Sequence, residues 1–525
     1  MNKIKSIIFF ILAALIAGCN KDLLDTRPND RVSTEIFWKT EKDATLAANA
    51  IYTYFGSADN FFSWDGITDI GHTNVPQSPE SFILKGQYDG LNSRISGEWT
   101  NAYAAIRAAN EFMANVDQVQ TTNTALITRL KGEVRTLRAY HYIKLASLFG
   151  DVPLVTTVLT LDESKNLKRT PVAQVWDFIS AELTEAATQL PNTQSEKGRI
   201  TKGAALGLKS RAMLYAGRFT DAAAAAKQVM DLNVYSLYPS YKNLFSYAAE
   251  YNVEVMMDIE FLKDTYSNNV FFAMGPFSQK NSQGHFAPTK NLVDAYAMSN
   301  GKDITDPTSG FDAFNPYANR DPRLGYSVFV LGDLLPDGKT YNSKPNSGTA
   351  DAVGYSFQAT NTGFNLEKYI NKEDLTLPSN GGINLIIMRY AEILLTYAEA
   401  KIEANQIDQS VLDAINLVRK RPDVNMPVLT SIGTQDNMRK IVRKERLVEL
   451  AFEGLRYMDI RRWKMAEQVM PGKIFGMTYS DNGTALKTIE VQAWSNTFDK
   501  SRDYLWPIPQ KERELNPNLT QNPNW

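Results

Sequence analysis

The first residue with distinctive chemistry is Cys19, the only cysteine among 525 residues. A lone thiol excludes an internal disulfide and a cysteine-ligated metal cluster, because both need at least two thiols. Upstream of it, Lys3 and Lys5 are followed by an apolar run at residues 7–16 and then by small residues. This order predicts a secretory signal peptide at residues 1–18, which is removed from the mature protein. The run is about half of the roughly 20 residues that span a bilayer, so we do not expect a retained transmembrane anchor.

The residues directly around the thiol indicate how it is modified. The sequence Ile16-Ala17-Gly18-Cys19 resembles a bacterial lipobox, in which the cysteine is acylated and the chain is cut just before it. Isoleucine in the first position departs mildly from the usual leucine. We expect Cys19 to be the first mature residue and to carry several acyl chains, palmitate among them, which together hold a protein firmly to a membrane. Residues 20–25 resemble the export signal of lipoproteins that reach the outer face. An ordinary signal peptide with an incidental cysteine is the alternative.

Residues that could catalyse a reaction form no recognisable motif. The three histidines, His72, His141 and His285, are too scattered for a zinc site, and no H-E-x-x-H sequence occurs. The chain also lacks a G-x-S-x-G motif and a Walker loop. A glycosidase-type pair of catalytic carboxylates remains an alternative among the 58 acidic residues, because a sequence does not give the distance between two side chains in the fold. We therefore expect no catalytic residue, metal site or cofactor, with a loop-bracing calcium ion left open. We interpret His141 as structural, because it lies in a helical pattern.

Composition limits the partners and suggests how many regions the chain forms. The 56 basic and 58 acidic residues nearly cancel, so the charge balance does not indicate nucleic acid or an anionic surface as a partner. With 43% hydrophobic residues the chain can bury a core. Its length exceeds the size at which a single core usually stops growing. We expect an N-terminal region at residues 19–232 and a C-terminal region at residues 233–525.

Four stretches have a clear helical period. Residues 124–150 carry apolar side chains at three- and four-residue steps and end in Gly150, shortly before a proline. Residues 170–191 begin with a Thr-Pro pair that suits an N-cap and a first helical position. Residues 201–231 and 389–421 each have the pattern of two helices joined by a short turn, as in tetratricopeptide-like hairpins. The sequence therefore predicts helical hairpins packed around one another.

The remaining stretches differ in composition. Residues 57–98 and 233–380 are rich in Gly, Asn, Ser, Pro and aromatic residues and lack a helical period. We predict that they form loops, short strands or insertions, which often carry function. Residues 439–464 are dense in charge. We interpret them as a helix supported by pairs three residues apart, such as Arg446 with Glu449, and not as a catalytic or basic site.

Six stretches of the chain carry a resemblance to known proteins, and in chain order they are EVRTLRAYHYIKLASLFGDVPLV (133–155), GRITKGAALGLKSRAMLYAGRF (198–219), RDPRL (320–324), MRYAEILLTYAEA (388–400), IVRKERLVELAFEGLRYMDIRRW (441–463) and YLWPIPQKERELNPNLTQNPNW (504–525). These stretches resemble landmarks of one protein family, the SusD/RagB lipoproteins, which bind glycans at the surface of Bacteroidetes for nutrient uptake. The resemblance implies a mainly α-helical SusD-like fold, in which four tetratricopeptide-like hairpins support an irregular, loop-rich lobe. It also implies a partner, a SusC-like TonB-dependent barrel of the outer membrane, over whose extracellular mouth the lipoprotein sits as a lid. The final Asn524 and Trp525 depart from the usual glycine-tyrosine ending.

The resemblance also implies where a ligand binds, because relatives build the ligand surface from two variable loops. The matching stretches are residues 57–98 and roughly 265–290. Both combine aromatic rings with carboxylate or amide groups, which suits the apolar C–H face of a sugar and its rim of hydroxyls. The alternative is that these aromatics only pin the loops to the helices; Trp99, nearby, is expected in the core. The expected ligand-binding residues are Phe61, Phe62, Trp64, Asp65, Asp69, Phe277, Gln283, His285 and Phe286.

The expected function is non-catalytic capture of an oligosaccharide at the outer membrane, facing the cell exterior, followed by delivery to the SusC-like transporter. Nucleic acid is not an expected partner. A RagB-like protein that does the same for oligopeptides is the main alternative, and a surface hydrolase is a weaker one. Exposed aromatic rings would favour a glycan, whereas unpaired backbone edges lining a cleft would favour a peptide.

Overall fold

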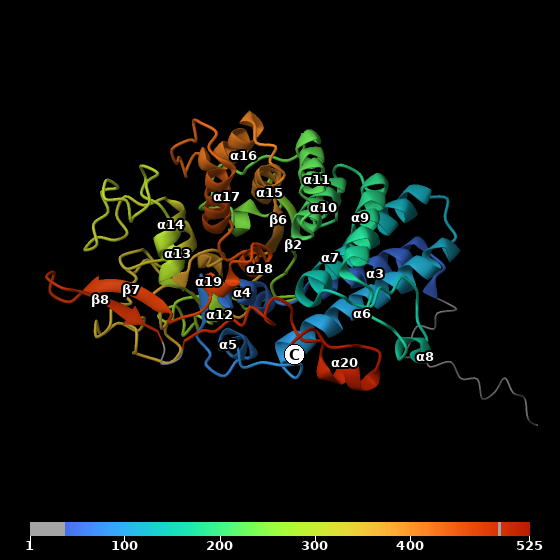
Figure 1. The fold of residues 1–525 in the computed structure, drawn as a ribbon, viewed down its shortest axis with the longest axis horizontal. Coiled ribbons are helices and arrows are strands. Elements are labelled where there is room, and N and C mark those ends of the chain that lie inside the picture. The colour runs from blue at the N-terminus through green and yellow to red at the C-terminus, as the bar shows by residue number, and fades with distance from the viewer. Residues whose placement is uncertain (1–36, 492–494) are drawn as a thin grey trace, which may run out of the picture.

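The computed structural model describes residues 37–491 and 495–525, so Cys19 and the predicted signal peptide at residues 1–18 lie outside the described residues. The described chain is mainly helical, and its strands form only two-stranded antiparallel sheets (Figure 1). The expectation of a mainly α-helical fold with an irregular lobe is thereby confirmed. Over these residues, no helix is both long enough and apolar enough to cross a membrane.

The long helices form one array that continues through both halves of the chain. In chain order they are α3 (Glu41–Tyr52), α6 (Ser93–Asn115), α7 (Thr124–Phe149), α9 (Val172–Gln189), α10 (Lys202–Tyr215), α11 (Phe219–Asp231), α15 (Tyr390–Glu403), α16 (Gln409–Arg419) and α17 (Gln435–Glu449). From α6 to α15 each helix packs against the next, and α16 and α17 both pack on α15 (Figure 1). The contact between α11 and α15 joins the regions expected at residues 19–232 and 233–525, whose boundary stays a prediction.

Side chains and turns at the helix ends explain where the array begins and breaks. The side chain of Asn123 caps α7 by accepting a hydrogen bond from a backbone N–H in the first turn. Gly217, with φ of 72°, makes the predicted turn between α10 and α11. The predicted start of α9 is shifted by one residue, because Pro171 and not Thr170 is its N-cap. Thr170 instead pairs through its backbone with Val152.

Shorter elements lie between and beside the long helices, and many of them fall in the stretches predicted to form loops, short strands or insertions. The short helices are α4 (Ala58–Gly66), α5 (Pro79–Leu84), α8 (Leu161–Ser164), α12 (Val270–Met274), α13 (Lys290–Ala295), α14 (Arg323–Ser327), α18 (Arg456–Arg462), α19 (Ala466–Val469) and α20 (Gln510–Leu515). The paired strands are β1 (Gly71–Thr73) with β3 (Phe286–Pro288), β2 (Val255–Ile259) with β6 (Leu385–Arg389), β4 (Val328–Phe329) with β5 (Asn365–Leu366), and β7 (Phe475–Ser480) with β8 (Leu486–Glu490). Residues 57–98 are therefore not one surface loop, because α4, β1, α5 and the start of α6 lie within them.

The core confirms two interpretations made from the sequence. Trp99 lies within α6 and is only 3% exposed, as expected for a core residue. His141 is completely buried on α7. Burial lowers the pKa of His141 to about 3, so its ring is neutral at pH 7 and packs as a structural residue.

The charged segment at residues 439–464 forms two helices and not one. The first, α17, ends at Glu449, and α18 begins at Arg456. Between them, Phe452 and Gly454 have φ values of 58° and 78°, in the left-handed region that ends helices. The predicted helix is interrupted, so pairing along one continuous helix face is not possible.

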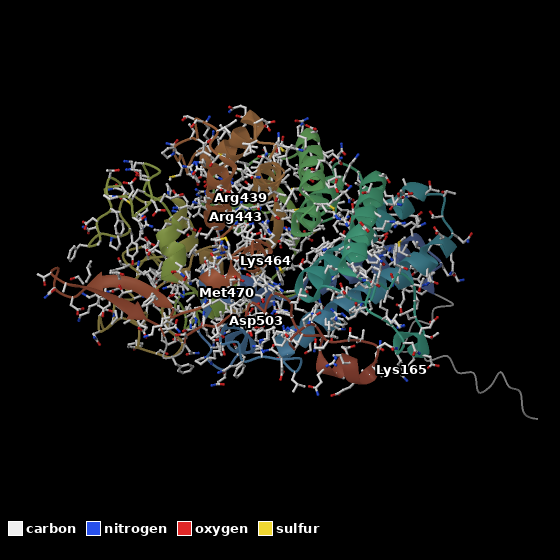
Figure 2. The ribbon with its side chains drawn as sticks, in the orientation of Figure 1. Lys165, Arg439, Arg443, Lys464, Met470 and Asp503 are labelled. Carbon is white, nitrogen blue, oxygen red and sulfur yellow. The ribbon has the colours of Figure 1, made fainter. Side chains whose placement is uncertain are left out.

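The charges of this segment instead reach distant elements. Arg446 pairs with Asp459 at 3.1 Å, across the break between α17 and α18. Arg439 and Arg443, both labelled in Figure 2, reach Glu403 on α15 at 2.8 and 3.1 Å. The interpretation of this segment as structural holds. The pairs named above fasten helices to one another, and one further pair, Asp459 with Arg462 at 2.8 Å, lies three residues apart within α18 and supports that helix locally.

A buried network of charges joins the small β2–β6 sheet to α17. The guanidinium of Arg389 lies 2.8 Å from Glu254 and 2.7 Å from Glu449. It also contacts Glu453 at 2.7 Å. Arg421 reaches Glu254 at 2.6 Å and Glu449 at 2.9 Å. All five residues are at most 5% exposed. Because an unpaired buried charge is costly, each member depends on the others being in place.

Candidate functional site

The first group of expected ligand residues lies in the interior of the protein. Most of the group belongs to α4, which packs against β1, β3 and α18. An aromatic ring that is almost completely covered cannot offer a face to a sugar. The expectation that these residues form an open aromatic platform is therefore wrong. The exposed fractions are 8% for Phe61, 0% for Phe62, 8% for Trp64, 0% for Asp65 and 6% for Asp69.

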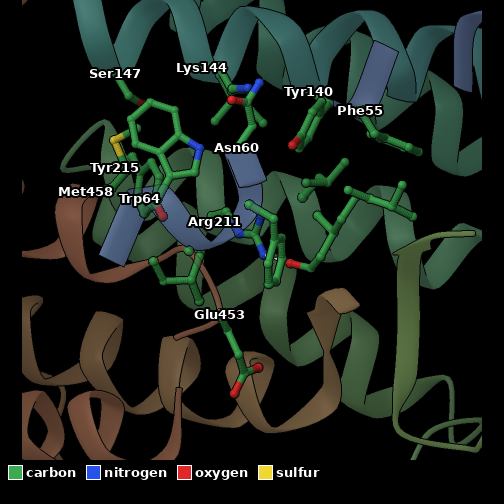
Figure 3. A pocket seen from close by; sticks show the side chains of 17 residues that line it. Phe55, Asn60, Trp64, Tyr140, Lys144, Ser147, Arg211, Tyr215, Glu453 and Met458 are labelled. Carbon is green, nitrogen blue, oxygen red and sulfur yellow. Dashed lines mark hydrogen bonds between the residues drawn. The ribbon is translucent and has the colours of Figure 1, made fainter. Parts of the chain in front are cut away.

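Neighbouring side chains cover the ring of Trp64. It stacks on Trp506, with ring centroids 5.5 Å apart and 20° between the planes. The guanidinium of Arg94 lies 4.5 Å from its centroid. Figure 3 shows Trp64 with Tyr140 and Lys144 at a pocket. The volume of this cavity is about 80 Å³. Ligand pockets usually measure about 300–1,000 Å³, so this cavity is too small for a sugar.

The two carboxylates of the first group hold the backbone together. Asp65 accepts hydrogen bonds from the backbone N–H groups of Gly454 and Arg456, at 2.8 and 2.9 Å. Burial raises the pKa of Asp65 to about 7, against the opposing effect of these two bonds. Asp69 forms an ion pair with Arg456 at 2.7 Å. Both carboxylates therefore fasten α4 and the residues after it to the start of α18 and are not free to bind hydroxyls.

The second group of expected ligand residues is divided between core and surface. Phe286, on β3, is 6% exposed and packs directly over Gly66, where an added Cβ would lie 2.2 Å from its ring. For Phe286 the alternative of a loop-pinning aromatic is therefore the better description. Phe277, Gln283 and His285 remain partly exposed. The His285 Nε2 and Gln283 Oε1 atoms lie 2.5 Å apart, so these two polar side chains are brought together.

Two aromatic residues that were not expected at the site extend this exposed part. Tyr355 lies beside Phe277, with ring centroids 6.4 Å apart, and is 60% exposed. Phe357, two residues further on, is 88% exposed. We refer to Phe277, Tyr355 and Phe357 as the aromatic surface. The sequence feature that could have indicated Tyr355 and Phe357 is their spacing of two positions. They lie within residues 233–380, a stretch that lacks a helical period.

Hydrogen bonds join the loops that carry the aromatic surface. The backbone N–H of Ser278, next to Phe277, donates to Asp351 Oδ1 at 2.8 Å. Asn74, just after β1, donates through its backbone to the His285 carbonyl at 2.7 Å. The side-chain amide of Asn74 donates to the carbonyl of Ala359 at 2.9 Å. Loops from three parts of the chain are thus joined beside the residues of the aromatic surface.

The chemistry of this surface suits a sugar. Exposed rings can cover the apolar C–H face of a pyranose, and nearby amide, imidazole and ammonium groups can bond its hydroxyls. The exposed Lys280 and Asn281 lie on the same loop as Gln283 and His285. Across the described ranges, no three His, Cys, Asp or Glu side chains are grouped so that they could hold a metal ion.

Comparison with protein families gives matches to both halves of the chain. A model described as the SusD family matches residues 253–525. A second model, described as starch-binding associating with outer membrane, matches residues 35–214. The two matches together include most of the irregular lobe and every long helix except α11, which lies between the two matched ranges.

Individual relatives agree with these matches along nearly the whole chain. A crystal structure of a SusD-like carbohydrate binding protein from Bacteroides fragilis is 30% identical, with a TM-score of 0.86, and covers 92% of this chain and 100% of that one. SusD-like protein P2 of Formosa agariphila is 27% identical, over 99% of each chain. A laminarin binding SusD-like protein, 21% identical with a TM-score of 0.72, has the same fold and covers 93% of this chain and 100% of that one.

Proposed function

Because the chain belongs to the SusD family, we propose that it is a non-catalytic protein that binds oligosaccharides at the outer membrane. The observation that carries the proposal is the aromatic surface, whose rings are exposed on loops that hydrogen bonds hold in place. Large apolar rings in water are a favourable surface for the C–H face of a sugar, because stacking removes both from water. The name of the second family model, which mentions starch binding and the outer membrane, supports the same proposal.

Two further features support a glycan over a peptide. The 30% identical relative from Bacteroides fragilis is described as a carbohydrate binding protein. A peptide that is recognised as an added strand needs an open sheet edge. The strands next to the aromatic surface, β1 and β3, are buried at every residue, so neither offers such an edge.

Replacing Tyr355 and Phe357 with alanine should weaken glycan binding at least about tenfold, a loss of about 1.4 kcal/mol. Both rings are mostly exposed, so the double variant should keep the unfolding temperature of the wild type. The measurement is isothermal titration of the soluble 20–525 form with maltoheptaose, laminariheptaose and chitohexaose. Phe314→Ala, which removes another half-exposed ring, at 49% exposure, is the matched control.

Wild-type affinity in the double variant would contradict the proposed site. Binding of oligopeptides by the wild type, with none of the glycans bound, would favour the RagB-like alternative. A glycan that is released unchanged after long incubation supports a binding protein, whereas shortened products would indicate a hydrolase.

Delivery to a transporter completes the proposed function. The captured glycan would pass to a SusC-like TonB-dependent barrel beneath the protein, with closure of the protein over the barrel trapping it. A site of modest affinity suffices for this purpose, because tethering makes the second contact intramolecular and raises the effective concentration of ligand.

We propose that a lipid on Cys19 supplies the tether, and Cys19→Ala should therefore release the protein from the membrane fraction. No acyl chain can be attached without the thiol, and labelling with radioactive palmitate should fall to background. The measurement is fractionation of cells that lack the partner barrel, so that protein contacts cannot retain the variant. Lys21→Ala is the control, because it leaves the thiol intact. Undiminished membrane association of the Cys19 variant would contradict the lipid anchor.

A further inference from the structure

A small cavity of about 120 Å³ lies in the irregular lobe and shares no lining residue with the aromatic surface. Its walls come mainly from α13, from the loop at residues 311–320 and from β7, and α13 packs against β7 (Figure 1). Much of the lining is apolar, because Val293, Phe311 and Phe364 contribute to it. A cavity of about 150 Å³ can hold a benzene molecule, so this one has room for about five non-hydrogen atoms. It therefore suits a small molecule, or one end of a larger one.

The hydroxyl of Tyr317, a lining residue, is buried and has no hydrogen-bond partner among the described residues. The ring of Tyr317 lies edge-on to Phe364, with centroids 6.3 Å apart and 85° between the planes. Burial raises the pKa of Tyr317 above its usual value, so the hydroxyl is protonated at neutral pH and can donate a hydrogen bond. A buried polar group without a partner is costly, and a ligand oxygen in the cavity would supply the missing acceptor.

The guanidinium of Arg320 also lines the cavity, and Arg320 is only 6% exposed. Its four hydrogen bonds within the described part of the chain all go to backbone carbonyls, at 2.6 to 3.3 Å. The acceptors are the carbonyls of Val293, Tyr296 and Pro316. A guanidinium carries five N–H groups, so at least one N–H of Arg320 is left for a ligand.

The charges that line the cavity favour an anion. Lys290 and Arg320 contribute two positive charges, whereas Asp294 contributes one negative charge and pairs with Lys290 at 2.5 Å. Asp321, next to Arg320 in the chain, pairs instead with Arg323 at 2.7 Å. The charge of Arg320 is therefore available to a ligand. A cation that is shielded from water gains most from an anion to which it can also donate a hydrogen bond.

We propose that this cavity binds a small aliphatic carboxylate. The carboxylate oxygens accept hydrogen bonds from the Tyr317 hydroxyl and the remaining N–H of Arg320, and the short carbon chain packs against Phe311, whose ring centroid lies 5.7 Å from the guanidinium. Apolar walls and two donors disfavour phosphate or sulfate, because their further oxygens would be buried without partners. The inference goes beyond the proposed glycan binding and does not depend on it, since the two sites have no residue in common.

Propionate and propionamide are the probes, because they have nearly the same size and shape but differ in charge. Titration of the soluble 20–525 form, followed by saturation-transfer NMR, should show saturable binding of propionate in the millimolar range, at least about tenfold tighter than that of propionamide. Tyr317→Phe removes only the hydroxyl and should weaken propionate binding at least about fivefold. Because no described residue bonds this hydroxyl, the unfolding temperature should not fall. Tyr326→Phe, on α14 and outside the cavity lining, is the matched control.

The outcomes distinguish this site from its alternatives. Equal binding of the two probes, or propionate binding that Tyr317→Phe leaves unchanged, overturns the carboxylate site, as does the absence of saturable binding. Displacement of propionate by an equal concentration of phosphate would indicate a general anion site and also overturns the proposal. Displacement by oligogalacturonate supports the site and identifies a charged glycan as the source of the carboxylate, whereas propionate binding without such displacement supports a free acid. Unchanged glycan affinity in Tyr317→Phe separates this proposal from the aromatic surface.

Discussion

Replacing Glu449 with alanine should lower the free energy of unfolding by about 3–5 kcal/mol, a large share of the stability of a typical protein. Its carboxylate is completely buried and lies 2.7 Å from Arg389, 2.9 Å from Arg421 and 2.9 Å from Arg323. Removing it leaves three buried guanidinium groups with one partner fewer each. Water cannot easily reach them to replace the lost contact, so the cost is that of uncompensated buried charge.

The charge state of Glu449 supports this expectation. Burial alone would raise its pKa, but the guanidinium groups of Arg389, Arg421 and Arg323 hold the pKa well below the usual value. Since the folded pKa is depressed, this carboxylate stabilises the fold above the ordinary pKa of glutamate, and the contribution is lost only as the pH falls well below it. At neutral pH the full effect should therefore be measured.

Urea unfolding followed by circular dichroism is the measurement for Glu449→Ala. Glu449→Gln, which keeps the size and some hydrogen bonds but removes the charge, should give a smaller loss. Arg107→Ala is the matched control, because Arg107 pairs with Glu111 at 2.9 Å on the surface, with 64% of its side chain exposed. Exposed pairs contribute little, so the control should barely move the unfolding midpoint. Equal shifts for the buried and the exposed variant would contradict the role given to the network.

The helical array could be predicted from the sequence because its signals are local. A helix such as α7 has its apolar period, its capping Asn123 and its terminal Gly150 within one continuous stretch. The charge network could not be predicted in the same way. Glu449 lies 60 residues from Arg389, and Arg456 lies 387 residues from Asp69. Spacing along a helix suggested neighbours as partners, but the left-handed turn at Phe452 separates α17 from α18 and directs these charges elsewhere.

A second limit of prediction from the sequence concerns which aromatic side chains of the candidate site are exposed. Trp64 and Phe357 both lie in stretches rich in aromatic and small residues, and both have the chemistry to stack on a sugar. The two residues differ in their surroundings, since Trp64 is 8% exposed and Phe357 is 88% exposed. That difference depends on Arg94 and Trp506, which come close to Trp64 only in the folded chain. A sequence contains the rings but does not state which of them the fold covers.

Trp64→Ala should therefore act on stability, with an expected loss of about 3–5 kcal/mol in the free energy of unfolding. The substitution removes a large buried ring and the stack with Trp506, and it enlarges a cavity that already measures about 80 Å³. Phe357→Ala should leave stability within about 0.5 kcal/mol of the wild type, because its ring has few contacts to lose. Trp64→Phe retains part of the packing and should fall between the two. Urea unfolding of the three variants is the measurement.

Glycan titration of the same variants separates packing from recognition. At a temperature where Trp64→Ala remains folded, its affinity for glycan should equal that of the wild type, because neither face of the Trp64 ring is open. Phe357→Ala should show the reverse pattern, with normal unfolding and weaker binding. If Trp64→Ala instead lost glycan binding while folded, Trp64 would have to contact the ligand through a rearrangement of α4. The opposite behaviour of two rings in similar sequence surroundings would thus locate the binding surface by experiment.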